Sequence, residues 1–333
     1  MNVRVSLVAL VLAAACGCGP SHSPTDPLPS WNEGPARRAI VAFVERVTTA
    51  GSPDFVPGPE RIAVFDNDGT LWPEHPLPFQ AAFMLDELER LAPEHPEWAD
   101  NVAISAALAG DVTSLIAGGP TALAEVVAVT HAGMTVEEFD RRVRAWLDAA
   151  RHPRFKTPYH DLTYRPMQEL LDYLRANGFK TFIVSGGGAD FMRVWAEDVY
   201  GIPPEQVIGS YGKARFEMID GQPTLRKEAG IEMVDDKAGK PVGIHRFIGR
   251  RPIACFGNSD GDLEMLQWTT IGHRPSFGLI VHHTDAEREY AYDAHSQSTG
   301  TLVTALEEAA RHGWTVVDMR RDWKTIFSRS PGS

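Results

Sequence analysis

Two hydrophobic patterns recur along the chain, and they alternate regularly in its second half. Short continuous apolar runs, such as Ile62–Phe65 and Pro252–Phe256, are typical of buried parallel strands. Between such runs lie segments with apolar residues at helical spacing, such as Met167–Ala176 and Leu302–Arg311. Strands that alternate with helices predict an α/β fold built on a doubly wound, Rossmann-like parallel sheet.

The same reasoning assigns the other elements of this sheet. It predicts a hairpin over Phe216–Leu225 with its turn at Asp220-Gly221. Further helices are expected at 36–47, 189–200, 241–248 and 263–268, and further strands at 181–184, 206–209, 279–282 and 315–319.

A stretch of about ninety residues that follows the first strand shows helix signals and almost no strand signals. A helix is expected at 79–91, and two more between Asp111 and Val129. Thr135 and Glu138 form a capping box that opens another helix. We therefore expect a helical cap at 77–164, inserted into an α/β core made of 36–76 and 165–333.

Composition and charge narrow the class of protein. The chain has 333 residues, of which 43% are hydrophobic and 23% charged, as in ordinary globular proteins. Its formal net charge is -12, and a nucleic acid or an anionic membrane surface would need a basic patch. We therefore expect no nucleic-acid partner.

The N-terminus resembles an export signal. A short basic start and the apolar run 5–15 are too short for a membrane span. Leu12–Cys16 resembles a bacterial lipoprotein processing site, which predicts a lipid anchor on Cys16. The residues around Cys18 match such a site less well. Cleavage to a soluble periplasmic protein is the alternative. We expect a signal at 1–18 and a flexible tether at 19–35, which is rich in Pro, Ser and Gly. The remaining cysteine, Cys255, lies in an apolar run and is expected in the core.

The most informative stretch is the end of the first strand, Phe65-Asp66-Asn67-Asp68-Gly69-Thr70. Ligands of open α/β sheets bind beyond the carboxyl ends of the strands. Alternation along an extended chain would place Asp66 and Asp68 on one side. Two carboxylates so close repel each other unless a cation or a proton relieves them. One can act as a nucleophile while the other acts as an acid and base.

Three more segments carry candidate chemistry. Ser185 and Gly186 follow another apolar run, and a hydroxyl with exposed N–H groups at a helix start can bind phosphate. Lys237 and Lys240 precede or begin a helix, and a lysine here can neutralise a carboxylate and a phosphoryl group. Gly257–Asp262 is an oxygen-rich turn of the kind that suits Mg²⁺.

Together these four segments resemble the haloacid-dehalogenase-like phosphatases, and the helical insertion resembles the first-type cap of phosphoserine phosphatase relatives. Asp66–Thr70 matches the Asp-x-Asp-Gly-Thr signature, Ser185 the second motif, Lys237 the third and Gly257–Asp262 the fourth. Asn258 departs from the family pattern, which has an aspartate there, and Asp260 or Asp262 could compensate for the lost charge.

The resemblance implies an exported phosphomonoester hydrolase that forms an aspartyl-phosphate on Asp66. Asp68 would be the acid and base, and Lys237 the catalytic lysine, with Lys240 as the alternative. Thr70, Ser185 and Gly186 would hold the phosphate. Mg²⁺ would bind Asp66, the Asp68 carbonyl, Asn258 and Asp262.

The substrate is expected to be a small phosphate ester, and the cap would close over it. Glu74 lies at the entry of the insertion, where it could meet a substrate amine, although a solvated loop glutamate is the simpler interpretation. His282, His283 and Asp285 follow a later strand and could border the site, although surface or satisfied histidines are the simpler interpretation. Two other functions stay open: a lipoprotein that binds phosphate esters with little turnover, and a phosphomutase.

Overall fold

Seven strands of the described residues form one sheet, in the order β4-β3-β2-β1-β5-β6-β7. This computed structural model describes residues 26–111, 114, 119–273, 275–296 and 300–328. Neighbouring strands are parallel, apart from the antiparallel pair β3–β4. The doubly wound α/β fold is therefore confirmed. The strands are β1 Ile62–Phe65, β2 Lys180–Gly188, β3 Val207–Ile219, β4 Gln222–Met233, β5 Ala254–Gly257, β6 Phe277–His282 and β7 Thr315–Asp318.

Both faces of the sheet are covered, and β1 shows how. Ala63 and Phe65 belong to one apolar cluster, which includes residues of α1 (Pro35–Thr48) and α7 (Arg165–Ala176). Ile62 and Val64 belong to a second cluster, which includes residues of α11 (Leu263–Thr270) and α12 (Thr304–His312). The sequence of a strand that is buried on both faces is a continuous apolar run, because every side chain packs against a layer of helices.

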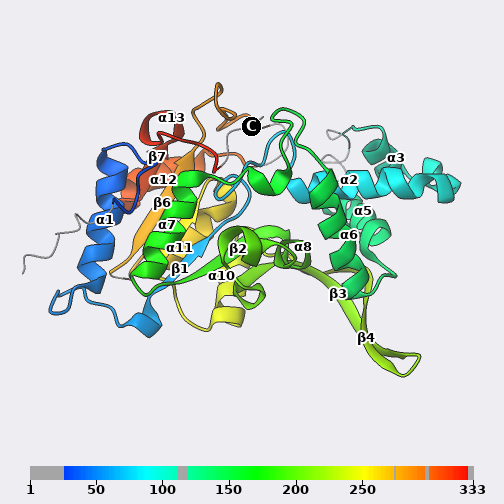
Figure 1. The fold of residues 1–333 in the computed structure, drawn as a ribbon, viewed down its shortest axis with the longest axis horizontal. Coiled ribbons are helices and arrows are strands. Elements are labelled where there is room, and N and C mark those ends of the chain that lie inside the picture. Colours follow the sequence, from blue (N-terminus) through cyan, green and yellow to red (C-terminus); the bar gives the residue numbers. More distant parts are fainter. Residues whose placement is uncertain (1–25, 112–113, 115–118, 274, 297–299, 329–333) are drawn as a thin grey trace, which may run out of the picture.

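Four of the described helices between β1 and β2 stand to one side of the sheet (Figure 1). They are α2 Phe79–Leu91, α3 Val102–Leu108, α5 Gly119–His131 and α6 Val136–Ala149. The capping box of α6 is confirmed: Thr135 Oγ1 accepts from Glu138 N, and Glu138 Oε2 accepts from Thr135 N. Helix α3 was not predicted, and part of the predicted stretch at 111–129 lies outside the described residues. The division into cap and core at 77–164 stays a prediction.

The predicted helix at 189–200 is wrong in its middle. It is two short helices, α8 Ala189–Arg193 and α9 Ala196–Tyr200, separated at Trp195. The Trp195 ring stacks on Trp72, with 4.1 Å between centroids, and its φ of -134° interrupts the helix. The other short elements are α10 Gly239–Gly243, a π-helix Ile244–Ile248, α13 Met319–Asp322, and 3₁₀ turns at Gly58–Glu60, Ala92–Glu94, Pro96–Asp100, Tyr159–Asp161, Pro204–Gln206 and Asp260–Asp262.

Strands β3 and β4 form a long hairpin that projects from the body of the molecule (Figure 1). Its turn is at Asp220 and Gly221, both with positive φ, as predicted for this dipeptide. The strand predicted at 206–209 is much longer, because β3 continues through polar residues that pair with β4. Main-chain hydrogen bonds of Lys227 with Gly133 and Met134 join β4 to the segment after α5. The hairpin thus connects the sheet to the inserted helices.

The tether predicted at 19–35 is wrong in its second half. Leu28 and Trp31 are fully buried, and Ser30 donates to Glu169 Oε1 at 2.7 Å. Cys16 and Cys18 lie outside the described residues. Cys255 is buried in the core, as predicted.

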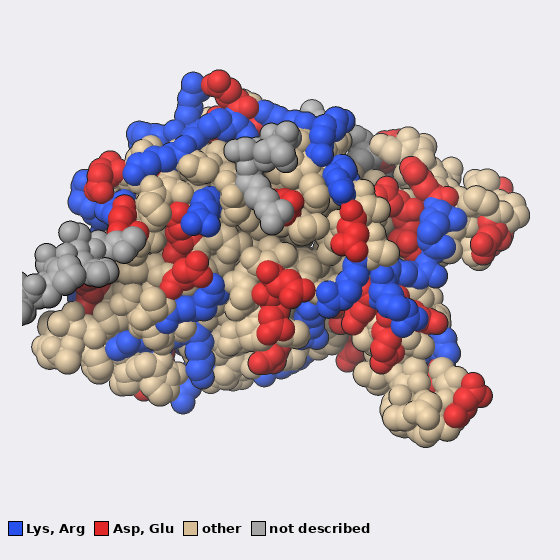
Figure 2. Space-filling model, viewed as in Figure 1, with Lys and Arg blue, Asp and Glu red and all other residues tan. Residues whose placement is uncertain are grey.

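No described helix has the length and apolar character needed to cross a bilayer. Figure 2 shows basic side chains gathered along the upper edge of the visible face and acidic and basic side chains mixed over the rest of it.

Candidate active site

The acid pair lies at the carboxyl end of β1, in the middle of the sheet. The Asp66 amide donates to Phe256 O at 2.9 Å, which continues the pairing of β1 with β5. Gly69 then turns the chain with a φ of +74°. A side chain there would collide with Asn258 Nδ2, 2.1 Å from the ideal Cβ position. Glycine is therefore required by both the backbone and the packing.

Lys240 is the lysine that contacts the acid pair. It is 2% exposed, and its Nζ lies 2.9 Å from Asp66 Oδ1 and 2.6 Å from Asp262 Oδ1. Burial lowers its pKa, but the charges of Asp262 and Asp66 outweigh burial and raise the pKa overall. The prediction of Lys237 is corrected: Lys237 is exposed, with a φ of +51° in the turn before α10, and lines the cavity described below. Helix α10 begins at Gly239, before the expected 241, so that Lys240 rather than Lys237 faces the core.

Asp68 is held by its own turn. Trp72 Nε1 donates to Asp68 Oδ1 at 2.6 Å, and Asn67 Nδ2 donates to the same atom at 3.3 Å. Burial raises the pKa of Asp68 to about 6, although the Trp72 hydrogen bond and the charge of Lys240 oppose the rise. Burial and the charge of Asp262 also raise the pKa of Asp66, against the effect of Lys240.

Ser185 faces the same space as Asp68. A Cβ placed on Gly187 would lie 3.4 Å from Ser185 Oγ, 3.6 Å from Asp68 Oδ2 and 3.7 Å from Gln80 Oε1. Ser185 Oγ also accepts from the Gly187 amide at 3.1 Å. Gln80, in the first turn of α2, accepts from the Gly188 amide at 2.6 Å, so an inserted helix is attached to this turn. Gly186, predicted to bind phosphate, is exposed beside them and lines the same cavity.

The Gly257–Asp262 turn is organised around Asp262, which is fully buried. Asp262 Oδ2 accepts from the amides of Asn258 and Ser259 at 2.9 and 3.1 Å, while Oδ1 meets Lys240. The structure thus places Asp262 as the counter-ion of Lys240, where the sequence predicted a metal ligand. Asp260 accepts from the amides of Val303 and Ala305 at the start of α12, so it does not compensate for Asn258 either.

Glu74 and Thr70 both fix Asn258. Asn258 Nδ2 donates to Glu74 Oε1 at 2.7 Å, and Thr70 Oγ1 donates to Asn258 Oδ1 at 3.2 Å. Tyr292 also donates to Glu74 Oε1, at 2.6 Å. Thr70 is fully buried and does not line the cavity, so the prediction that it binds phosphate is corrected. Glu74, which was predicted to meet a substrate amine, is 4% exposed. It accepts instead from the side-chain amide of Asn258, which stands where the family has an aspartate.

The donor set suits a hard cation. Asp66 and Asp262 contact Lys240, whose charge also acts on Asp68, so three carboxyl groups share one ammonium. Among the described residues, no three His, Cys, Asp or Glu side chains form a metal-binding group. Mg²⁺ needs only one or two carboxylates, because it keeps several waters and accepts amide and carbonyl oxygens. Asp66, the Asp68 carbonyl and Asn258 Oδ1 therefore fit this ion.

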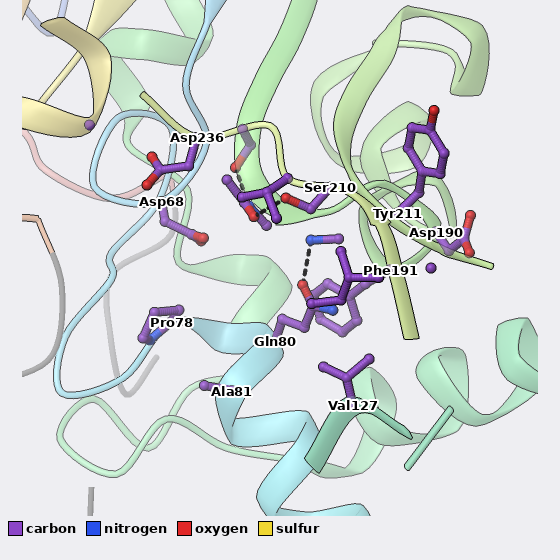
Figure 3. A pocket seen from close by; sticks show the side chains of 18 of the residues that line it. Asp68, Pro78, Gln80, Ala81, Val127, Asp190, Phe191, Ser210, Tyr211 and Asp236 are labelled. Atoms are coloured by element: carbon purple, nitrogen blue, oxygen red, sulfur yellow. Dashed lines mark hydrogen bonds between the residues drawn. The ribbon is translucent and has the colours of Figure 1, made fainter. Parts of the chain in front are cut away.

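The acids open into a cavity of about 700 Å³. Figure 3 shows Asp68 and Asp236 on one side of the cavity and Asp190 and Tyr211 on the other. Pro78, Gln80 and Ala81 come from the start of α2 or just before it, and Val127 comes from α5, so sheet and inserted helices share its walls.

Comparison with known proteins agrees with this geometry. Residues 63–267, more than half of the chain, match the family model of the haloacid dehalogenase-like hydrolases. The chain belongs to this family. No curated protein sequence matches it.

Solved structures are similar to this chain, and one of them, with a TM-score above 0.5, supports the fold. A conserved protein of unknown function from Anaerococcus prevotii DSM 20548 is similar at a TM-score of 0.53 with 16% identity, over 84% of this chain and 91% of that one. A protein of unknown function from Bordetella pertussis Tohama I gives 0.49 with 17% identity, over 78% and 99%. A phosphoserine phosphatase from T. onnurineus gives 0.31 with 18% identity, over 79% and 97%.

Sequence reasoning missed the cavity's far end. His131, Asp190 and Lys227 line it, from α5, α8 and β4, and Gln80 of α2, beside the Ser185 turn, was missed as well. None of them lies in a recognisable motif, and they are brought together by the packing of the hairpin against the inserted helices.

Proposed function

We propose that this hydrolase is an exported, Mg²⁺-dependent phosphomonoesterase that acts through an aspartyl-phosphate on Asp66. The observation that carries the proposal is the ion-paired chain Asp66–Lys240–Asp262 at the end of the central strand, with Asp68 and Ser185 facing the same space. Export is supported by the pattern of residues 1–16, with lipidation of Cys16 as the proposed anchor.

The residues divide the reaction as follows. The Asp66 carboxylate attacks phosphorus, and the bond to the ester oxygen breaks as Asp68 protonates that oxygen. Water then attacks the phosphorus of the aspartyl-phosphate; Asp68 takes its proton, and inorganic phosphate and the Asp66 carboxylate are released. Ser185 and the amides of its turn hold the phosphoryl oxygens, and Lys240 offsets their charge.

Mg²⁺ bound by Asp66, the Asp68 carbonyl and Asn258 would neutralise charge on the phosphoryl group. Asp262 keeps Lys240 in place, since an ammonium shared by two carboxylates has one favoured position. The presence of Asp68 favours phosphate-ester hydrolysis over dehalogenation, because displacement of halide needs no acid at the leaving group.

The proposal is tested with a generic aryl phosphate and a phosphate-release assay. Asp66→Asn, which is close to isosteric, should lower kcat by about a thousandfold or more, and removal of Mg²⁺ by a chelator should lower it by about a hundredfold or more. Undiminished turnover in either case would contradict the proposal.

The two lysines provide a matched pair for the same assay. Lys240→Met should abolish turnover and also destabilise the fold by about 3–5 kcal/mol, because Asp66 and Asp262 lose their shared counter-ion. Lys237→Met should keep both stability and most activity, since Lys237 is exposed. Tight ester binding without phosphate release would instead indicate a binding lipoprotein, and an isomerised ester a phosphomutase.

A further inference from the structure

The far end of the cavity contains a buried polar side chain that the proposed chemistry does not use. His131, at the end of α5, is 6% exposed and lines the same cavity as Asp66. Its Nε2 is buried and has no hydrogen-bond partner among the described residues. A buried polar atom without a partner is costly, so it points to a group that the cavity receives.

The protonation of His131 follows from its neighbour. Thr130 Oγ1 donates its single hydrogen to Val126 O at 2.7 Å, and His131 Nδ1 lies 2.7 Å from the same Oγ1. With that hydrogen directed to Val126 O, we assign the ring proton to Nδ1, which then donates to Thr130 Oγ1. Burial and the charge of Lys227 lower the pKa of His131 to about 3, so the ring is neutral. Nε2 is then a pure hydrogen-bond acceptor.

His131 lies among aromatic side chains and one ion pair. Lys227, 6% exposed, is ion-paired with Asp190, and its Nζ lies 4.6 Å from the centre of the Phe139 ring. The His131 and Phe139 rings are 4.8 Å apart. The two charges offset each other, so this end of the cavity does not call for a charged ligand. These residues, with Phe191 of α8, are called here the distal subsite.

We propose that the distal subsite binds the leaving group of the phosphate ester and selects an uncharged, apolar group that carries an O–H or N–H donor for His131 Nε2. This inference rests on the proposed phosphatase function. A cavity of about 700 Å³ holds far more than a phosphate, and pockets of about 300–1,000 Å³ are typical for ligands of drug size. The subsite is built by α5, α6, α8 and β4, so the hairpin and the inserted helices together would set specificity.

The test uses pairs of aryl phosphates that differ only in the donor. 4-(2-Hydroxyethyl)phenyl phosphate is compared with 4-propylphenyl phosphate, and a biphenyl pair with a distal hydroxymethyl or ethyl group covers a longer reach. For at least one pair, kcat/KM of the hydroxyl ester should be about tenfold higher or more, because the alkyl ester leaves Nε2 unpaired. A ratio near one for both pairs would overturn the subsite.

Variants assign the preference to His131. His131→Phe keeps a ring but removes the acceptor, so the ratio should fall to about one. His131→Gln keeps an acceptor and should retain part of the preference, which also guards against a folding defect in the Phe variant. The control is His245→Phe, at an exposed position outside the cavity, which should behave as wild type. A preference that survives in His131→Phe would contradict the assignment.

Two readouts separate the subsite from catalysis. Calorimetry on Asp66→Asn should show the same preference in binding, and its loss in the double variant with His131→Phe. Preference in binding without turnover by wild type would overturn the proposed function but keep the subsite; equal binding of both esters would overturn the subsite. Long-range ¹H–¹⁵N spectra should show His131 protonated at Nδ1 alone from pH 5.5 to 8, and a proton on Nε2 would contradict the acceptor role.

Discussion

Asn258 and Glu74 distribute the charge of the active site in an unusual way. The amide stands where the family has an aspartate, and the Glu74 carboxylate accepts from it at 2.7 Å. With Thr70 donating to the amide oxygen, the orientation of Asn258 is fixed from both sides. The negative charge missing from Asn258 therefore lies one hydrogen bond further away, on Glu74.

An exchange of the two groups tests this arrangement. Asn258→Asp alone puts two buried carboxylates side by side and should lower the free energy of unfolding by about 3–5 kcal/mol. Glu74→Gln alone should cost less, because its amide oxygen can still accept from Asn258. The double variant restores one donor and one acceptor, so a coupling of about 2 kcal/mol or more is expected from urea unfolding in chelator.

The chain offers a matched control at its surface. Asn101 Nδ2 donates to Glu125 Oε2 at 2.9 Å, the same chemistry at a part-exposed position. Asn101→Asp should cost less than about 1 kcal/mol, because solvent screens the two carboxylates. Additive effects of Asn258→Asp and Glu74→Gln would contradict the paired role.

At the scale of elements, sequence predicted the strands that position the chemistry. Ile62–Phe65 is a continuous apolar run ending in Asp66, and its burial on both faces makes such a strand readable from sequence. Ser185 and the Gly257 turn follow from the same pattern on neighbouring strands. These strand ends must meet in a parallel sheet, whatever the loops do.

Elements whose position depends on non-local packing were not predicted. Lys237 and Lys240 differ by about one helical turn, and only the start of α10 at Gly239 decides which one is buried. The extra length of β3 depends on β4, because its exposed polar residues have no strand pattern of their own. His131 and Lys227 meet only because β4 bonds to the segment after α5.

The end of β6 gives a prediction on pH. His283 is buried; its Nε2 lies 2.7 Å from Gly69 O and its Nδ1 lies 3.1 Å from Glu289 Oε2. Burial lowers the pKa of His283, but the hydrogen bond and charge of Glu289, with the charge of Glu74, raise it overall. Protonated His283 therefore stabilises the folded state. This contribution is complete below the unfolded pKa of about 6.5, and it is lost as pH rises through the raised pKa of the folded state.

The measurement is urea unfolding of wild type and His283→Gln between pH 6 and 9. The difference in unfolding free energy should be largest at pH 6 and shrink as pH rises. In a Glu289→Gln background, the pH-dependent part should shrink, because the partner charge is gone. A difference that grows with pH would contradict the ion pair.

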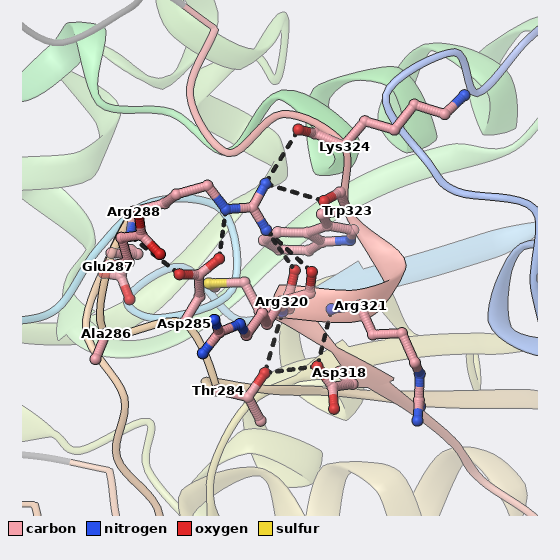
Figure 4. A network of polar contacts seen from close by, with 12 residues as sticks. Thr284, Asp285, Ala286, Glu287, Arg288, Asp318, Arg320, Arg321, Trp323 and Lys324 are labelled. Atoms are coloured by element: carbon pink, nitrogen blue, oxygen red, sulfur yellow. Dashed lines mark hydrogen bonds and ion pairs between the residues drawn. The ribbon is translucent and has the colours of Figure 1, made fainter.

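At the scale of the whole molecule, both ends of the described chain pack together. Trp31 and Trp323 meet edge to face with 5.9 Å between centroids, and Lys324 N donates to Ser30 O at 2.8 Å. Arg288 holds the C-terminal segment in this position (Figure 4). These contacts between the two ends explain why Leu28 and Trp31 are buried rather than part of a tether.

Arg288 provides the test of this closure. Its guanidinium is ion-paired with Asp285 and donates to four carbonyls of the C-terminal segment, those of Met319, Arg320, Trp323 and Lys324. Arg288→Met leaves the Asp285 carboxylate, 2% exposed, without its counter-ion and should cost about 2–4 kcal/mol.

The control for Arg288→Met is Arg321→Met, whose side chain is 72% exposed and should cost less than about 1 kcal/mol. Limited proteolysis should find new cleavage within 319–328 in the Arg288 variant, because the segment loses its anchor before the sheet unfolds. Equal stability of the two variants would show instead that the contact of Trp31 with Trp323 holds the end of the chain without the guanidinium, since that contact is common to both.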